Sequence, residues 1–308
     1  MLLLKIVNKL LKKTKHYAKK SGSPFFVTAA ARLENKKKAL IFSELDKLAV
    51  TPDVQQSAGQ EITKRIIWIC WFQGLEQAPP LVRRCIESVQ RNANGAEVVI
   101  LTDASIRTWL DLPAHIIEKY DAGLISKAHY SDIVRCALLY QYGGIWMDAT
   151  LFLTRPVPDS LFTFSFSSLR SDACSPALAT SQGYWTAFLL AAQKNSALAK
   201  YVRDLFYGYW QHHDALIEYF LIDYSLLYAV EKYPQFAALI RNQPIIGNDR
   251  YLIRQFINKP VNSETRQALQ NDPTGIYKLS HKEKYQTEHN GVETLYSKIL
   301  HGDFDLNG

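Results

Sequence analysis

Hydrophobic and polar residues along the chain follow two periodicities, one typical of helices and one typical of buried strands. The segment SKAHYSDIVRCALLYQYGGIWMDATLF, residues 126–152, contains both. Apolar residues at helical spacing from Ala128 to Leu138 predict a helix, and two glycines end it because glycine adopts positive φ at low cost. The apolar run Ile-Trp-Met that follows predicts a short buried strand. Asp148 then lies at the far end of that strand.

The helix predicted in this segment has a polar face. His129, Asp132 and Arg135 are three residues apart, so their side chains lie on one side of the helix. A polar face that leads to an acid at a strand end is the usual geometry of a ligand site in an open α/β sheet. A surface ion pair between Asp132 and Arg135, with a turn that starts at Asp148, explains the same spacing. Spacing alone leaves both interpretations open.

The rest of the chain alternates strands and helices. Strands are expected in KRIIWICWFQG (64–74), AEVVILT (96–102) and TFSFSSL (163–169), and helices from Pro79-Pro80 to Asn92, at about 104–110 and 113–122, and in the aromatic-rich residues 185–241. This order predicts an α/β fold that binds a nucleotide at the carboxyl ends of its strands. The chain has no G-x-G-x-x-G or Walker A sequence, so a dinucleotide or P-loop fold has no motif support.

The first 20 residues predict a basic amphipathic helix. Its apolar stripe is bordered by lysines and consists of Leu3, Leu4, Val7, Leu10 and Leu11. The segment is too short and too charged to span a bilayer, and it lacks the order of a signal peptide. It fits a helix that lies on an anionic membrane surface, although a helix docked on its own domain or on a partner has the same pattern.

A second helix is expected at about residues 25–48, after the break Ser-Gly-Ser-Pro and before Thr51-Pro52. We therefore predict a basic helical arm over residues 1–60 and a single domain over residues 61–308.

Composition and charge narrow the classes of protein. A hydrophobic content of 47% and an aromatic content of 12% exclude a disordered chain. Residues 1–38 contain 11 Lys or Arg and one acid, a net +10, so the total of +7 leaves −3 for the remainder. Because the body is not basic, we expect no nucleic-acid partner. The four cysteines, Cys70, Cys85, Cys136 and Cys174, lack zinc-ligand spacing, which favours a reducing compartment and no structural zinc.

At AHYSDIVRCALLYQYGGIWMDAT the chain resembles the capsular-polysaccharide-synthesis branch of glycosyltransferase family 32. Members of that branch have a helix with S-D-[IL]-[LV]-R, then YGG, a hydrophobic triplet and D-x-D or D-A-T. The blocks IIWICWFQG, PPLVRRCIESV, ISKAHYSD, the YW…YF pair at 209–220 and KLSHK resemble the same family in the same order. The resemblance covers about residues 62–285. It implies a GT-A fold with a mixed, mainly parallel central sheet and added helices, a nucleotide-sugar donor, and retention of anomeric configuration.

The resemblance also implies roles for single residues. Asp132 and Arg135 would hold hydroxyls of the donor sugar, a task that suits a carboxylate acceptor and a forked guanidinium donor. His129 would extend this face, although a packed or surface histidine is the more frequent case. Trp68 would stack on the nucleobase, unless it belongs to the core. Asp148 would lie beside the ribose and the metal-bound diphosphate and would act in the reaction.

Three further candidates have less support. Thr102, which ends the second predicted strand, and Lys282, in the basic cluster IYKLSHKEK (276–284), are expected to bind the nucleotide; a solvated basic tail is the alternative for that cluster. Asp223 is a catalytic candidate that would face the acceptor or the reactive carbon of the sugar. A buried aspartate that pairs within a helical layer explains Asp223 equally well.

The chain departs from D-x-D at its last position, where Thr150 stands in place of the second acid. The family implies a divalent cation, Mn²⁺ or Mg²⁺, with Asp148 and His281 as candidate ligands. A threonine hydroxyl is a weaker, neutral ligand, which puts metal binding in question. Lys278, Lys282 and Lys284 are an alternative source of positive charge, through direct contact with phosphate oxygens.

The sequence therefore predicts a retaining hexosyltransferase that uses a nucleotide-sugar donor. Its acceptor would be a polysaccharide or a lipid-linked saccharide of capsule or surface-polysaccharide synthesis. We expect it in the cytoplasm, bound peripherally to the inner face of the membrane through residues 1–20. The alternatives are a non-catalytic GT-A-like scaffold of an envelope-assembly complex and a transferase that acts on a protein. The sugar, nucleotide and linkage depend on pocket shape, which one sequence does not reveal.

Overall fold

The computed structural model describes residues 2–53, 64–172, 180–247, 249–304 and 306. At its centre is a five-stranded sheet with the order β2-β1-β3-β6-β5. The strands are β1 (Ile66–Cys70), β2 (Glu97–Leu101), β3 (Gly144–Met147), β5 (Phe166–Ser168) and β6 (Leu189–Ala192). β1 pairs in parallel with β2 and β3, whereas β6 is antiparallel to β3 and β5. Four strands thus share one direction, which confirms an α/β fold with a mixed, mainly parallel sheet.

Helices cover both faces of this sheet, so its middle strands are apolar without alternation. Trp68 and Trp146 enter a core on the face covered by helices α6, α8 and α9, while Ile67 and Ile145 enter a second core on the face covered by α3. The bounds are α3 (Pro80–Arg91), α4 (Asp103–Trp109), α5 (Ala114–Asp121), α6 (Lys127–Gln141), α7 (Ser160–Thr163), α8 (Ala197–His212), α9 (Leu221–Lys232) and α10 (Pro234–Arg241).

The predicted helices agree with these bounds to within about two residues, and the predicted strands contain β1, β2 and β5 but extend up to four residues beyond them. The start of residues 185–241 differs. That stretch was expected to be helical, but β6 lies at its beginning. Its four residues, Leu-Leu-Ala-Ala, are buried on both faces. An apolar run this short and without alternation cannot be told from a piece of buried helix, which explains the error.

The C-terminal residues form a smaller unit against α3. β7 (Ile276–Lys278) pairs antiparallel with β4 (Leu151–Leu153), and the register sets Lys278 opposite Leu151. Around this pair lie α11 (Ser263–Asn271), α12 (Leu295–His301), the hairpin β8 (Glu288–His289) and β9 (Val292–Glu293), and the short helix η2 (Leu252–Gln255). Ile276 and Leu279 are fully buried. The first residues of the basic cluster are therefore packed against the body. Only its last residues, 281–284, are exposed as a solvated tail would be.

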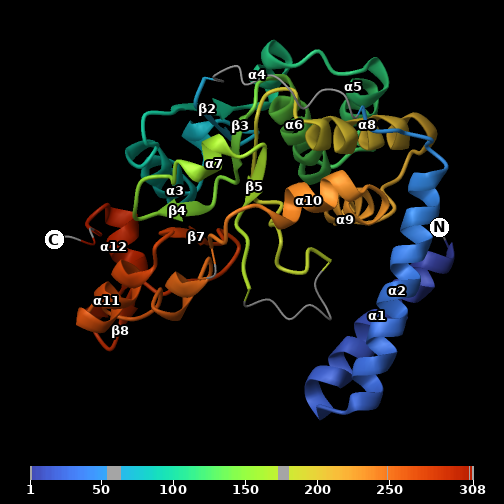
Figure 1. Cartoon of the computed structure of the whole chain (residues 1–308). Helices are drawn as coiled ribbons and strands as arrows, with labels where there is room; N and C mark the ends of the chain where they lie inside the picture. The colour runs from blue at the N-terminus through green and yellow to red at the C-terminus, as the bar shows by residue number, and fades with distance from the viewer. Residues whose placement is uncertain (1, 54–63, 173–179, 248, 305, 307–308) are drawn as a thin grey trace.

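The predicted arm is a helical hairpin of α1 (Leu2–Ser21) and α2 (Pro24–Asp46) that projects from the body (Figure 1). Leu4, Val7 and Leu11 are buried. Ile41 of α2 lies in the main core, and Lys37 pairs with Glu218 of the body at 2.8 Å. Docking on its own domain thus accounts for part of the apolar stripe of α1.

None of the described helices is long and apolar enough to cross a membrane. Residues 54–60 of the predicted arm lie outside the described residues. Cys70, Cys85 and Cys136 are free, and Cys174 lies outside the described residues.

Candidate functional site

The tight turn between α6 and β3 positions the site. α6 starts at Ser126, whose hydroxyl accepts a hydrogen bond from the backbone N–H of His129 at 3.3 Å. It ends before Gly144, which has a φ of 96° and lies against β1. A Cβ at Gly144 would lie 2.5 Å from the carbonyl oxygen of Ile66, so only glycine allows β3 to pair here. The turn therefore brings the polar face of α6 to the end of β3.

Arg135 is the centre of the polar face. Its guanidinium lies 3.0 Å from Asp132 and 3.8 Å from Asp148, donates to the carbonyl oxygen of Ala187, and stacks over the ring of Trp146. Its side chain is only 6% exposed. Burial disfavours its charge, but Asp132 and Asp148 outweigh that effect and raise the pKa of Arg135. The surface ion-pair interpretation is therefore wrong, because this pair lies in the interior.

Asp148 ends β3 and is bound from three sides. The ammonium group of Lys278, on β7, lies 2.7 Å from its Oδ2. Trp146 donates its indole N–H to Oδ1 at 3.1 Å, and the guanidinium of Arg135 lies 3.8 Å from the same oxygen. Burial alone would raise its pKa, but Lys278 and Arg135 outweigh burial and lower the pKa of Asp148 below its usual value. About a third of the side chain is still exposed, so a ligand can reach the Asp148–Lys278 pair.

Asp223 of α9 belongs to the same charged group. Its Oδ1 accepts a hydrogen bond from the indole N–H of Trp185 at 2.9 Å. Burial raises the pKa of Asp223 to about 6, with a smaller contribution from Asp132, while Arg135 lowers it. Asp223 thus stands where its protonation responds to the Asp132–Arg135 pair.

His129 is packed in the core, which is one of the more frequent positions of a histidine. The ring is 1% exposed and contacts the rings of Phe206 and Trp210. Its Nδ1 lies 3.4 Å from Asp132 without hydrogen-bond geometry. His129 therefore packs in the core beside Asp132, and neither of its ring nitrogens has a hydrogen-bond partner among the described residues.

Trp68 does not have the position expected for a ring that stacks on a nucleobase. It lies within β1 and not at its end, it is fully buried, and its indole N–H donates to the carbonyl oxygen of Gly143 at 2.9 Å. Trp109 and Tyr142 cover its ring. The core interpretation is thus correct for Trp68, because strand alternation turns its side chain into the helical core. Phe72, just beyond the strand, is the half-buried aromatic residue on the same side.

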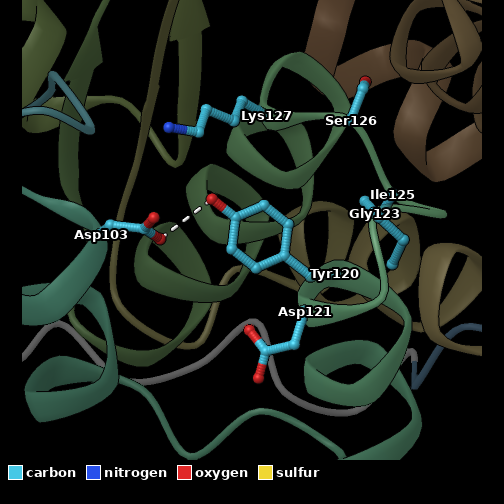
Figure 2. A pocket seen from close by; sticks show the side chains of 7 residues that line it. All are labelled: Asp103, Tyr120, Asp121, Gly123, Ile125, Ser126 and Lys127. Carbon is cyan, nitrogen blue, oxygen red and sulfur yellow. Dashed lines mark hydrogen bonds between the residues drawn. The ribbon is translucent and has the colours of Figure 1, made fainter.

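An open pocket of about 420 Å³ lies beside the end of β2, which Asp103 follows (Figure 2). Its lining consists of Asp103, Tyr120, Asp121, Gly123, Ile125, Ser126 and Lys127. The hydroxyl of Tyr120 donates to Asp103 at 2.9 Å, and Lys127 lies over the Phe72 ring. The pocket therefore offers the ring of Tyr120, two acids, Asp103 and Asp121, and one base, Lys127.

Asp103 and Asp148 follow strands β2 and β3, which pair in parallel with β1 on its two sides. The pocket and the charged group therefore lie at the carboxyl ends of neighbouring strands. Cys70 ends β1 between them, and burial is the main cause that raises its pKa to about 12.

The two remaining nucleotide-binding candidates lie at the ends of strands or in exposed loops. Thr102 follows β2 and caps α4, since its hydroxyl accepts from the backbone N–H of Ser105 at 3.1 Å. Lys282 is exposed, in the loop after β7. His281 in the same loop contacts the ring of Trp71 at 5.3 Å, and burial together with Lys282 and Lys278 lowers the pKa of His281.

The residues around Asp148 do not form a good site for Mn²⁺ or Mg²⁺. Such ions prefer several oxygen ligands, with carboxylates foremost. Thr150 supplies no charge, Lys278 occupies the Asp148 oxygen that a cation would need, and the described residues contain no group of three His, Cys, Asp or Glu side chains that could hold a metal ion.

Comparison with known proteins agrees with the sequence blocks. A family model described as "Capsular polysaccharide synthesis protein" matches residues 24–299. The chain therefore belongs to the capsular polysaccharide synthesis protein family, and the match starts at α2, earlier than the blocks at 62–285.

The curated relatives are glycosyltransferases of fungi. "Glycosyltransferase afumC" of Aspergillus fumigatus is 25% identical over 47% of this chain and 40% of its own length. "O-glycosyltransferase braB" of Annulohypoxylon truncatum is 32% identical over 30% of this chain and 24% of its own. The chain thus spans less than half the length of these relatives. The solved structure "PaToxG Glycosyltransferase" aligns with 89% of this chain and 97% of its own at 16% identity, with a TM-score of 0.38.

Proposed function

We propose that the chain is a retaining glycosyltransferase that moves a hexose from a nucleotide-sugar donor to a saccharide acceptor. The observation that carries the proposal is the row of buried and partly buried charges at the carboxyl edge of the sheet. Asp132, Arg135, Asp148 and Lys278 lie within 4 Å of one another in succession. Family membership and the glycosyltransferase relatives support the same activity.

Each part of a nucleotide sugar has a chemical match along this edge. A carboxylate and a guanidinium bind vicinal hydroxyls, so the hexose is assigned to Asp132 and Arg135. Lys278 is the partly exposed cation beside Asp148 and suits the diphosphate. The pocket of Asp103, Tyr120 and Lys127 takes the nucleoside, because it offers aromatic surface and polar groups of both charges.

In the proposed transfer, the acceptor hydroxyl oxygen forms a bond to the anomeric carbon while the bond from that carbon to the diphosphate oxygen breaks. The diphosphate leaves with the electron pair and takes up the hydroxyl proton, which balances the charge. Positive groups that already face the diphosphate stabilise this developing charge. Asp223, which we assign to the reactive-carbon side, stabilises the positive charge that develops on the sugar.

The acceptor is proposed to be a lipid-linked or polymeric saccharide of capsule or surface-polysaccharide synthesis, reached at the inner face of the membrane. The support for this location is the exposed face of α1. Leu3, Ile6 and Leu10 are each about half exposed on that face, among exposed lysines. Apolar side chains with adjacent lysines bind anionic lipid surfaces.

A panel of nucleotide sugars tests the donor site. Titration calorimetry with the purified full chain is expected to show saturable binding of at least one donor. Arg135→Ala and Asp148→Ala weaken it by about tenfold or more, since each removes a charge-assisted contact. The exposed Arg83→Ala on α3 is the matched control. A folded protein that binds no donor of the panel overturns the proposal and favours the alternative of a non-catalytic scaffold, for which Thr150 is the argument. Transfer to a peptide but to no saccharide would favour a protein acceptor.

A further inference from the structure

Lys278 is held in place by its strand. The register of β4 and β7 sets it opposite Leu151, its backbone N–H donates to the carbonyl oxygen of Arg250 at 2.8 Å, and its carbonyl oxygen accepts from Arg254 at 2.8 Å. Its side chain crosses the ring of Phe188 at 5.0 Å and ends 2.7 Å from Asp148. With 19% of the side chain exposed, the ammonium group is neither a free surface charge nor fully enclosed.

The oxygens near Asp148 already accept hydrogen bonds, which makes them a poor fit for a divalent cation. Oδ2 of Asp148 binds Lys278, and Oδ1 binds the indole N–H of Trp146. The carbonyl oxygen of Thr150 accepts from the backbone N–H of Leu279 at 3.0 Å. A divalent cation would have to displace the ammonium group and would then find one carboxylate and a neutral hydroxyl, where it prefers about six oxygen ligands.

We infer that Lys278 supplies, at this site, the positive charge that a divalent cation would otherwise supply to the donor diphosphate, so that the donor binds without metal. This inference rests on the proposed function. An ammonium group has three donors, and only one is needed for Asp148, which leaves the others for phosphate oxygens. Asp148 then acts as a positioning residue that orients Lys278, and Arg135 has no part in replacing the metal because Asp132 and the carbonyl oxygen of Ala187 already bind it.

The first experiment measures binding of nucleoside diphosphates to the full chain, because they contain the diphosphate and are available as a complete set. Calorimetric titrations with UDP, GDP, ADP and CDP are run in EDTA and again in millimolar MnCl₂. We expect at least one diphosphate to bind, with affinities in the two solutions that agree to within about threefold. The corresponding nucleoside is expected to bind much more weakly in both.

The outcomes separate the inference from the function on which it rests. A diphosphate that binds in MnCl₂ but loses most of its affinity in EDTA overturns the inference and leaves the donor site standing. If no diphosphate binds in either solution, the donor site itself is wrong and the inference falls with it.

The second experiment removes the charge of Lys278. Lys278→Met keeps most of the side-chain volume over Phe188 and is expected to weaken binding of the same diphosphate by about tenfold or more, because a charge-assisted hydrogen bond is lost. Added Mn²⁺ does not restore it, since Thr150 cannot complete a metal site. Lys278→Arg keeps the charge and recovers part of the affinity. The exposed Lys259→Met is the matched control, and melting curves by circular dichroism check that each variant is folded. Affinity that is unchanged in folded Lys278→Met, or that Mn²⁺ restores there, contradicts the inference.

Discussion

Arg135 and Asp132, one turn apart on α6, form an ion pair at 3.0 Å in which both side chains are almost fully buried. Burial of two charges has a large desolvation cost, which their attraction offsets only while both are present. The pair is therefore fixed in a single geometry before a donor arrives, and removal of one partner leaves the other as an uncompensated buried charge.

A double-mutant cycle tests this relationship. We expect Arg135→Ala to lower the free energy of unfolding by about 3–5 kcal/mol. Asp132→Ala combined with Arg135→Ala costs less than the sum of the single changes, because the second change removes the stranded charge. Urea unfolding followed by circular dichroism measures the free energy of unfolding of the native chain, the two single variants and the double variant. Strict additivity would show that the two charges are not coupled.

Trp68 can be assigned to the core by one substitution. Trp68→Phe removes the indole N–H that the carbonyl oxygen of Gly143 accepts, and leaves a gap beside Trp109. The expected loss of unfolding free energy is about 2–4 kcal/mol, with nucleoside diphosphate affinity unchanged. Chemical denaturation and calorimetry on the same sample give both numbers. If Trp68→Phe is as stable as the native chain but binds the nucleotide more weakly, Trp68 stacks on the nucleobase and is not a core residue.

Much of this site could be predicted from the sequence, because its residues lie close together along the chain. The periodicity of α6 and the two glycines predict that Asp132, Arg135 and Asp148 approach one end of β3, but spacing alone leaves a surface ion pair as an equal alternative. Trp68 was misassigned because resemblance fixes the block IIWICWFQG but not which of its rings points toward the helices. β6 was missed because a four-residue strand buried on both faces has no alternation.

Sequence patterns do not predict the contacts between segments that are distant along the chain. Lys278 was one of three lysines considered as a source of charge, and only the register of β4 with β7 distinguishes it from the exposed Lys282. The pocket beside Asp103 also depends on Tyr120, which belongs to none of the sequence blocks, and on Lys127, whose block ISKAHYSD does not by itself indicate a pocket. A pairing across 130 residues depends on tertiary structure, which local periodicity does not encode.

Asp223 makes stability depend on pH. Its pKa is raised from 3.8 to about 6 in the folded protein, so the folded state binds the proton more tightly than the unfolded state. The stability that Asp223 contributes is therefore fully present below about pH 4 and is lost as pH rises through about 6. Asp223→Asn removes this loss and still offers an oxygen to the indole of Trp185.

We expect Asp223→Asn to be more stable than the native chain at about pH 7.5, by at most about 3 kcal/mol, and to lose most of that advantage at about pH 4.5. Urea unfolding of both proteins at the two pH values measures the difference, and comparison within each pH cancels the titration of other groups. An advantage that is the same at both values would mean that Asp223 is ionised throughout.

The hairpin of α1 and α2 divides the apolar residues of α1 into a buried and an exposed set. Leu4, Val7 and Leu11 pack inside the protein, whereas Leu3, Ile6 and Leu10 form a second, exposed stripe one position away around the helix. The first stripe packs α1 against the protein, whereas the second is free to take part in the proposed membrane contact. The exposed Lys5, Lys9, Lys12 and Lys13 give this stripe the basic border that anionic lipids attract.

Replacement of all three exposed residues, in Leu3→Ser, Ile6→Ser and Leu10→Ser combined, is expected to release the protein from vesicles that contain phosphatidylserine. Three partly buried aliphatic side chains contribute roughly 1 kcal/mol or more each to membrane insertion, so the vesicle-bound fraction falls by more than about tenfold. Flotation of vesicles measures it, and deletion of residues 1–20 is the more drastic version. Val292→Ser, which changes an exposed apolar residue on β9, is the control. Donor binding stays unchanged in all of these variants, because the stripe lies on the hairpin and not at the sheet edge. Persistent flotation of the triple variant would show that α1 does not anchor the protein to lipid.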